Sequence, residues 1–76
     1  MVKLELYRVF REVAEAGNIS LAAENLYLSQ SAVSQSVKQL EQQLGTRLFL
    51  RSPRGVTLTE DGRLLFLSLI HISEPT

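Results

Sequence analysis

Five polar residues between positions 30 and 38 would share one face of the chain if that segment is helical. Four of them are spaced by three and four residues, and the fifth stands beside them in the first turn. Glutamine can bond bidentately to adenine, serine can bond base edges or phosphate oxygens, and lysine can neutralise a phosphate. The mixture suits the major groove of double-stranded DNA, although it equally suits a solvated surface helix. The five residues are Gln30, Ser31, Ser34, Gln35 and Lys38.

Apolar residues on the opposite face predict the helix that would carry these groups. Ser29 can cap its N-terminus by accepting a backbone hydrogen bond, and Gly45 suits the left-handed residue that follows a helix. The sequence therefore predicts a helix from Gln30 to Leu44. Its apolar positions, which recur at about the helical period, are Val33, Val37, Leu40 and Leu44.

A shorter helix is expected just before this one, in the segment that begins at Ile19. Ser20 is a candidate N-cap for it, and Leu21, Ala22 and Leu26 give it apolar contacts for a core. A short helix, a tight turn and a longer helix with a polar outer face form a helix-turn-helix, which is a DNA-reading arrangement. We place it at residues 19–38.

The flanking segments complete a small domain. An apolar stripe predicts a first helix from about Lys3 to Ala16, which Gly17 and Asn18 would end. The stripe consists of Leu6, Val9, Phe10, Val13 and Ala14.

After the helix-turn-helix, residues 48–58 read as a two-stranded hairpin around a turn at residues 52–55. Such a hairpin would be a wing. Arg51 and Arg54 could approach phosphates or the minor groove there, or could simply be solvated. Thr59 then suits the N-cap of a fourth helix, whose first turn would hold two acids that the helix dipole favours.

This arrangement resembles the N-terminal winged helix-turn-helix domain of LysR-type transcriptional regulators. The resemblance covers about Leu4 to Phe66 and implies a mainly α fold with a three-helix core, a two-stranded wing and the start of a linker helix. The domain would span residues 2–60, and the linker helix would begin at residues 59–66. The matching residues are Ala22-Ala23, Leu26, Ser29-Gln30, Ala32-Val33-Ser34, Leu40-Glu41, Leu44-Gly45, Leu48-Phe49, Arg51, Leu58-Thr59 and Gly62.

The resemblance also implies site roles and partners. Gln30, Ser31, Ser34 and Gln35 would sit where family members touch bases and nearby phosphates of double-stranded DNA. Gln35 matches a position that varies between regulators and helps to set operator preference, whereas Ser31 stands where the family commonly has proline. The full-length protein would be a homodimer or higher oligomer joined through the linker helix. Its small-molecule inducer would bind a larger C-terminal domain of two α/β halves, which this sequence lacks.

Charge distribution agrees with this interpretation better than total charge does. The formal net charge is zero, which by itself argues against a nucleic-acid binder. Residues 29–58, however, hold four basic residues and one acid, a net charge of +3, whereas residues 1–28 carry −1 and residues 59–76 carry −2. With so few cations a lone domain should bind weakly. A dimer would place two recognition helices in successive major grooves, roughly 34–36 Å apart.

Other function classes find little support in the sequence. There is no cysteine, so disulfides and thiolate metal sites are excluded. The single histidine, His71, stands between two isoleucines and is no evidence for catalysis, and we expect neither an enzyme nor a cofactor. The run from Leu64 to Ile72 is too short to span a bilayer, and no signal peptide is evident, so we expect a cytoplasmic protein.

The last ten residues, 67–76, depart from the preceding pattern. They are rich in apolar and β-branched residues and lack the polar face that a continuing linker helix needs. They also resemble one translated frame of a transposase-type sequencing adapter. We therefore expect a non-native tail on a truncated regulator whose native sequence ends near Phe66. If the tail is instead a natural apolar segment, the chain would be a stand-alone small DNA-binding protein. A separate alternative for the whole domain is a winged helix whose polar face binds another protein.

Overall fold

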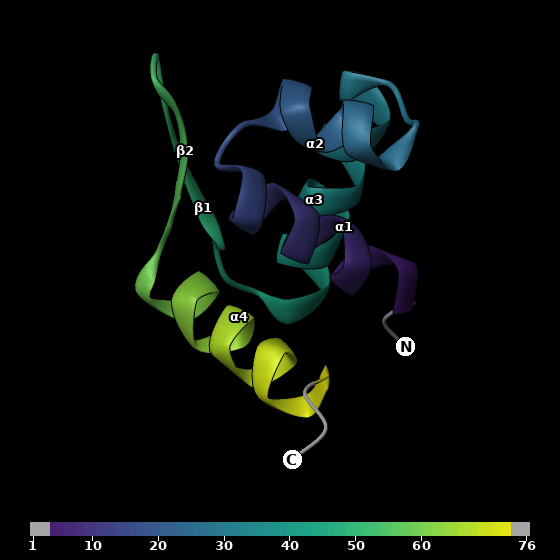
Figure 1. Ribbon diagram of the computed structural model, residues 1–76. Coiled ribbons are helices and arrows are strands. Elements are labelled where there is room, and N and C mark those ends of the chain that lie inside the picture. The colour runs from purple at the N-terminus through teal and green to yellow at the C-terminus, as the bar shows by residue number, and fades with distance from the viewer. Residues whose placement is uncertain (1–3, 74–76) are drawn as a thin grey trace.

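Three helices, a hairpin and a fourth helix follow one another along the chain, as Figure 1 shows. The computed structural model describes the backbone of residues 4–73 and the side chains of residues 4–70. Helices α1 to α3 pack together, and the hairpin lies along one side of them. The tip of the hairpin and α4 lie at opposite ends of the molecule. The elements are α1 (Leu4–Ala16), α2 (Ile19–Leu26), α3 (Gln30–Leu44), β1 (Phe49–Ser52), β2 (Gly55–Leu58) and α4 (Glu60–Ser73). The predicted fold class is confirmed.

One hydrophobic core joins α1, α2, α3 and the start of the wing. The predicted α1 stripe is buried apart from Ala14, which is half-buried, and the predicted start at Lys3 lies outside the described residues. The ring of Phe10 packs against that of Phe49 with centroids 5.2 Å apart, so the first helix contacts the first strand. The buried apolar residues are Leu6, Val9, Phe10, Val13, Ala22, Ala23, Val33, Val37, Leu40, Leu48 and Phe49.

The cap of α2 is not the residue that the sequence suggested. The Asn18 side chain accepts a hydrogen bond from the Leu21 N–H at 3.0 Å, and α2 begins at Ile19. Ser20 therefore lies inside the first turn, and its prediction as the N-cap was wrong. The reason lies one residue earlier, because Gly17 has a φ of +69° and turns the chain so that Asn18, with extended backbone, enters the helix. Asparagine caps a helix as well as serine does.

The boundaries of α3 are those expected. Its cap is Ser29, whose Oγ accepts from the Ala32 N–H at 3.1 Å, and it ends at Gly45 with a φ of +71°. The turn from α2 is made by Tyr27, a left-handed non-glycine residue whose side chain is 95% exposed. The N–H of Leu28 donates to the Ala23 carbonyl at 2.9 Å, so the turn is tied back to α2.

The wing is an antiparallel pair in which Phe49 lies opposite Leu58 and Ser52 opposite Gly55. The Val56 N–H donates to the Gly17 carbonyl oxygen at 3.1 Å, which attaches β2 to the turn between α1 and α2. A Cβ at Gly55 would overlap that same oxygen, so this position accepts only glycine. The predicted hairpin is confirmed, and one strand of it is held against the helices.

Helix α4 begins as predicted and continues further. The Thr59 hydroxyl accepts from the Gly62 N–H at 3.0 Å, as an N-cap does, and donates to the Arg47 carbonyl oxygen at 2.6 Å. The helix then runs through Ser73, beyond the predicted segment 59–66, because Leu65, Phe66 and Leu69 pack in succession against the core. The assignment of residues 67–76 to an adapter stays a prediction, and residues 74–76 lie outside the described ones.

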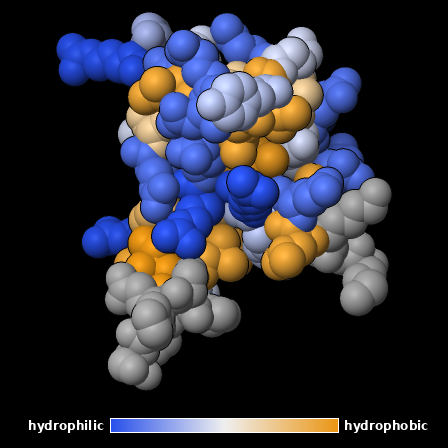
Figure 2. All heavy atoms as spheres, turned by 45° about the vertical axis from the view of Figure 1, so that its right-hand side comes forward, coloured by the Kyte–Doolittle hydropathy of each residue, from blue (hydrophilic) through white to orange (hydrophobic). Residues whose placement is uncertain are grey.

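An apolar surface remains on α4. Leu64 is 60% exposed and Leu67 is 54% exposed, one helical turn apart. Figure 2 shows hydrophobic side chains gathered beside the C-terminal end of the chain, where α4 lies. This surface is available for contact with another apolar face.

We expect Gly62→Ala to destabilise the domain, although alanine favours a helix. A Cβ at this position would overlap the Leu48 carbonyl oxygen, so α4 must shift away from the start of β1. Overpacking of this kind typically costs about 1–3 kcal/mol. Chemical denaturation measures the loss, and Arg63→Ala at the next, exposed position serves as the control. A Gly62→Ala variant that gains stability would show that the close approach of α4 does not matter.

Candidate nucleic-acid interface

The five polar residues predicted from α3 all lie on its outer side. Gln30, Ser31, Gln35 and Lys38 are exposed, and Ser34 is half-buried. The buried face of the same helix holds Val33, Val37 and Leu40, so the core fixes the orientation of α3 about its axis. The polar face is therefore presented to solvent as one rigid row.

The wing adds one of its two predicted arginines to this row. Nη2 of Arg51, on β1, donates to Ser34 Oγ at 3.5 Å, which is a long hydrogen bond between the strand and the helix. Arg54 lies instead in the turn of the hairpin, at the end farthest from α4 (Figure 1). The structure brings Arg51 to the α3 face and places Arg54 at the tip.

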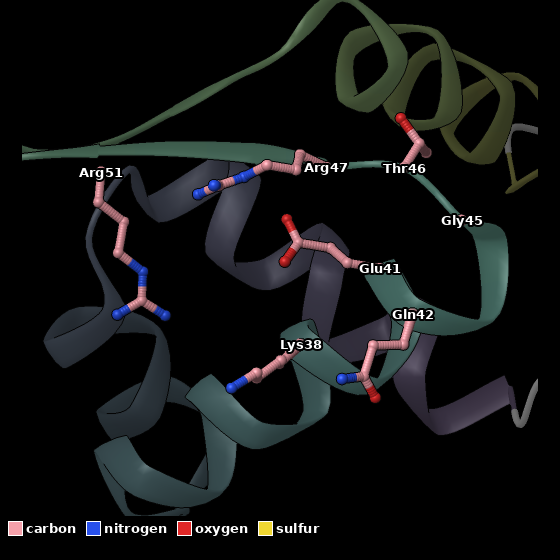
Figure 3. A pocket seen from close by; sticks show the side chains of 7 residues that line it. All are labelled: Lys38, Glu41, Gln42, Gly45, Thr46, Arg47 and Arg51. Carbon is pink, nitrogen blue, oxygen red and sulfur yellow. The ribbon is translucent and has the colours of Figure 1, made fainter.

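A groove of about 630 Å³ opens between the C-terminal half of α3 and the strand β1. Figure 3 shows Arg47 and Arg51 reaching into it from the β1 side, while Lys38, Glu41 and Gln42 project from α3. Sequence reasoning identified Lys38 and Arg51 but counted Arg47 only as part of the local charge. Arg47 stands in the link between α3 and β1, and no local pattern marks it. The groove is lined by Lys38, Glu41, Gln42, Gly45, Thr46, Arg47 and Arg51.

Glu41 is the second residue whose role the sequence left open. Its Oε2 accepts from the Leu48 N–H at 2.7 Å and from the Phe49 N–H at 3.2 Å. An acid in the last turn of a helix faces the negative end of the helix dipole, which disfavours it. Two backbone donors offset this effect, and the carboxylate sets the direction in which the chain enters β1. An acid at that unfavourable position was the only local signal.

A second, smaller hollow of about 200 Å³ lies where the start of α2 meets the wing. Ser20, Gln30 and Arg51 all line it, so the residue predicted as the cap of α2 borders the same face as two predicted site residues.

Within residues 4–73, no helix combines the length and apolar character needed to cross a bilayer. Among residues 4–70, whose side chains are described, no three acidic, histidine or cysteine side chains gather as a metal site would require. His71 lies outside the described side chains.

The part of the chain that forms this geometry matches a known protein family. Residues 4–63 match the model of the bacterial regulatory helix-turn-helix proteins of the lysR family. The chain belongs to the LysR family. The transcriptional regulator YofA of Bacillus velezensis is 44% identical over 75 residues, which cover 91% of this chain and 26% of that protein. The RuBisCO operon transcriptional regulator of Allochromatium vinosum is 49% identical over 65 residues, covering 86% of this chain and 22% of that protein.

Solved structures show the same fold within this LysR family. The DNA-binding domain of CbnR, in its complex with DNA, superposes with a TM-score of 0.87 at 36% identity, covering 92% of this chain and 80% of that one. The DNA-binding domain of BenM, bound to its catB site 1 DNA, gives a TM-score of 0.87 at 30% identity, covering 92% of this chain and 78% of that one. Against full-length regulators such as YofA, the chain spans only about a quarter of the length.

We expect Glu41→Ala to cost about 2 kcal/mol or more of stability, because hydrogen bonds to a charged group contribute about 1.5–3 kcal/mol and two backbone donors lose theirs. Thermal or urea unfolding measures this cost. Gln43→Ala, an exposed change on the same helix, is the control and should be near neutral. Glu41→Gln keeps one acceptor oxygen and should fall between the two. Equal stability of all three variants would mean that the carboxylate does not hold the junction.

Proposed function

We propose that this chain is the DNA-binding part of a LysR-type transcriptional regulator and binds double-stranded DNA with sequence preference. One observation carries the proposal. The core orients α3 so that its polar residues form a single row on the outer side, four of them exposed and Ser34 half-buried, and the wing arginine Arg51 meets that row at Ser34. Membership of the LysR family and similarity to domains solved in complex with DNA support the same conclusion.

We infer a role for each residue of this row. Gln30 and Gln35 read base edges, because each amide can donate and accept at once. Ser31 and Ser34 bond base edges or nearby phosphates, since a hydroxyl serves either. The cationic residues neutralise phosphates and fix the register of the domain on the duplex. These are Lys38 on α3, Arg51 on the wing strand and Arg54 at the wing tip.

Regulation requires more than this one domain. Helix α4 leaves Leu64 and Leu67 exposed, which gives a second copy an apolar face to pack against in a full-length homodimer or higher oligomer. The protein would act on the chromosome, in the cytoplasm of a bacterial cell. An inducer would act through a C-terminal domain, since the relatives extend well beyond the matched region. We propose no catalytic step and no cofactor for this chain.

Binding specificity can be separated from general affinity with two single changes. We expect Gln35→Ala to relax base preference at one position of each half-site, because a bidentate amide contact discriminates by about 1–3 kcal/mol. Arg54→Ala should instead weaken binding to all sequences alike and reduce the salt slope by about 0.9 per lost phosphate contact. Selection from random duplexes followed by titration at several salt concentrations measures both effects.

Two results would contradict this assignment. Equal losses on every sequence from both variants would remove Gln35 from base reading. Binding by the unmodified chain that does not depend on DNA sequence, with a salt response unlike counterion release, would favour the other winged-helix role, in which the polar face binds a protein.

A further inference from the structure

Three cations from three successive elements surround the groove beside α3. Lys38 comes from the helix, Arg47 from the link between α3 and β1, and Arg51 from the strand. In Figure 3, Arg51 points from β1 toward the α3 side, Arg47 runs along the strand, and Lys38 projects from α3. All three are exposed, so an incoming ligand can reach them without opening the fold.

One acid, Glu41, lines the groove together with the three cations, so the lining keeps a net charge of +2. The Glu41 Oε2 accepts from the Leu48 and Phe49 N–H groups. Asp61 accepts a hydrogen bond from the hydroxyl of Thr46, which lies at the opposite end of the groove from Arg51. Among the residues that the structure describes, none of the three groove cations has an ion-pair partner. The groove therefore carries excess positive charge at the end where Arg51 lies.

The position of the groove points to the anion that it would receive. Arg51 joins the groove to the outer face of α3 through its hydrogen bond to Ser34, and Lys38 follows Ser34 by one helical turn. A helix that lies in the major groove is bordered by the phosphates of the two strands, so a cationic groove beside that helix meets the DNA backbone. The planar guanidinium of arginine also matches phosphate oxygens in a bidentate way.

We propose that this groove binds a phosphate of the DNA backbone at the edge of the major groove, and that Arg47 is a contact residue there. The inference rests on the proposed function and adds a residue to it. Arg47 is held in place by the same link that Thr59 fixes, because the Thr59 hydroxyl donates to the Arg47 carbonyl oxygen. The junction of α3, β1 and α4 therefore fixes the backbone from which the Arg47 side chain extends, and the contact carries no sequence information.

The test uses the 76-residue chain and the duplex that it selects from a random pool. Arg47→Gln should bind every sequence more weakly, with unchanged base preference. Its salt slope should be smaller by about 0.9. When salt rises from 50 to 200 mM, the factor by which affinity falls should then be about threefold smaller than for the wild-type chain. Arg8→Gln, which removes an exposed arginine on α1 outside the groove, is the charge-matched control and should keep the wild-type slope. Arg47→Lys keeps the charge and should keep most of the slope.

A scan with single neutral methylphosphonate linkages assigns the contact. For the wild-type chain, a neutral linkage at one particular phosphate of each half-site should lower affinity. The same linkage should not change the affinity of Arg47→Gln. If Arg47 has only a structural role, the variant should respond to every linkage as the wild-type chain does. Wild-type slope and wild-type scan in Arg47→Gln would overturn the groove proposal while leaving the proposed function intact. If Arg47→Gln does not fold, the same scan on Arg47→Lys decides, because a shorter ammonium contact must alter the response at that phosphate alone. A wild-type chain without preference for any duplex would instead overturn the proposed function.

Discussion

The arrangement of recognition helix and wing depends on one carboxylate that two backbone N–H groups share. Glu41 begins the last turn of α3, and its carboxylate accepts from the Leu48 and Phe49 N–H groups, so the end of the helix is tied to the start of the first strand. The position of Arg51 along β1 follows from that attachment, and so does its contact with Ser34. The acid stands at a position that helix electrostatics disfavours, and its two backbone hydrogen bonds offset that cost.

Two further hydrogen bonds fix the wing. Near its tip, the Val56 N–H donates to the Gly17 carbonyl oxygen, which ties the wing to the turn between α1 and α2. At its base, the Thr59 N–H donates to the Leu48 carbonyl oxygen, which closes the hairpin. At both places another backbone segment lies close to a glycine, so a Cβ at Gly55 or Gly62 would overlap a carbonyl oxygen. A two-stranded hairpin alone is marginally stable in water, so these contacts supply the rigidity that the strands lack.

Sequence periodicity and capping chemistry were sufficient for elements whose signals are local. The α1 stripe, the Ser29 cap and the left-handed Gly45 each depend on residues within one or two turns. The choice between Asn18 and Ser20 as the cap of α2 was different, because both residues can cap and the φ of Gly17 decides between them. The roles of Arg47 and Glu41 could not be predicted from the sequence for a related reason. Their roles appear only when the chain reverses after α3 and brings residues 47–51 beside the helix.

The same reversal explains how a chain of zero net charge can present a cationic surface. Bases and acids balance along the sequence, but folding gathers Lys38, Arg47 and Arg51 around one groove while Glu41 is turned toward backbone donors. A surface built from so few cations gains little affinity in a single copy, because each phosphate contact contributes a salt slope of only about 0.9. In a symmetric dimer every such contact occurs twice. Under the proposed function, affinity for DNA would therefore depend on pairing of the domains, and whatever controls their spacing would also control binding.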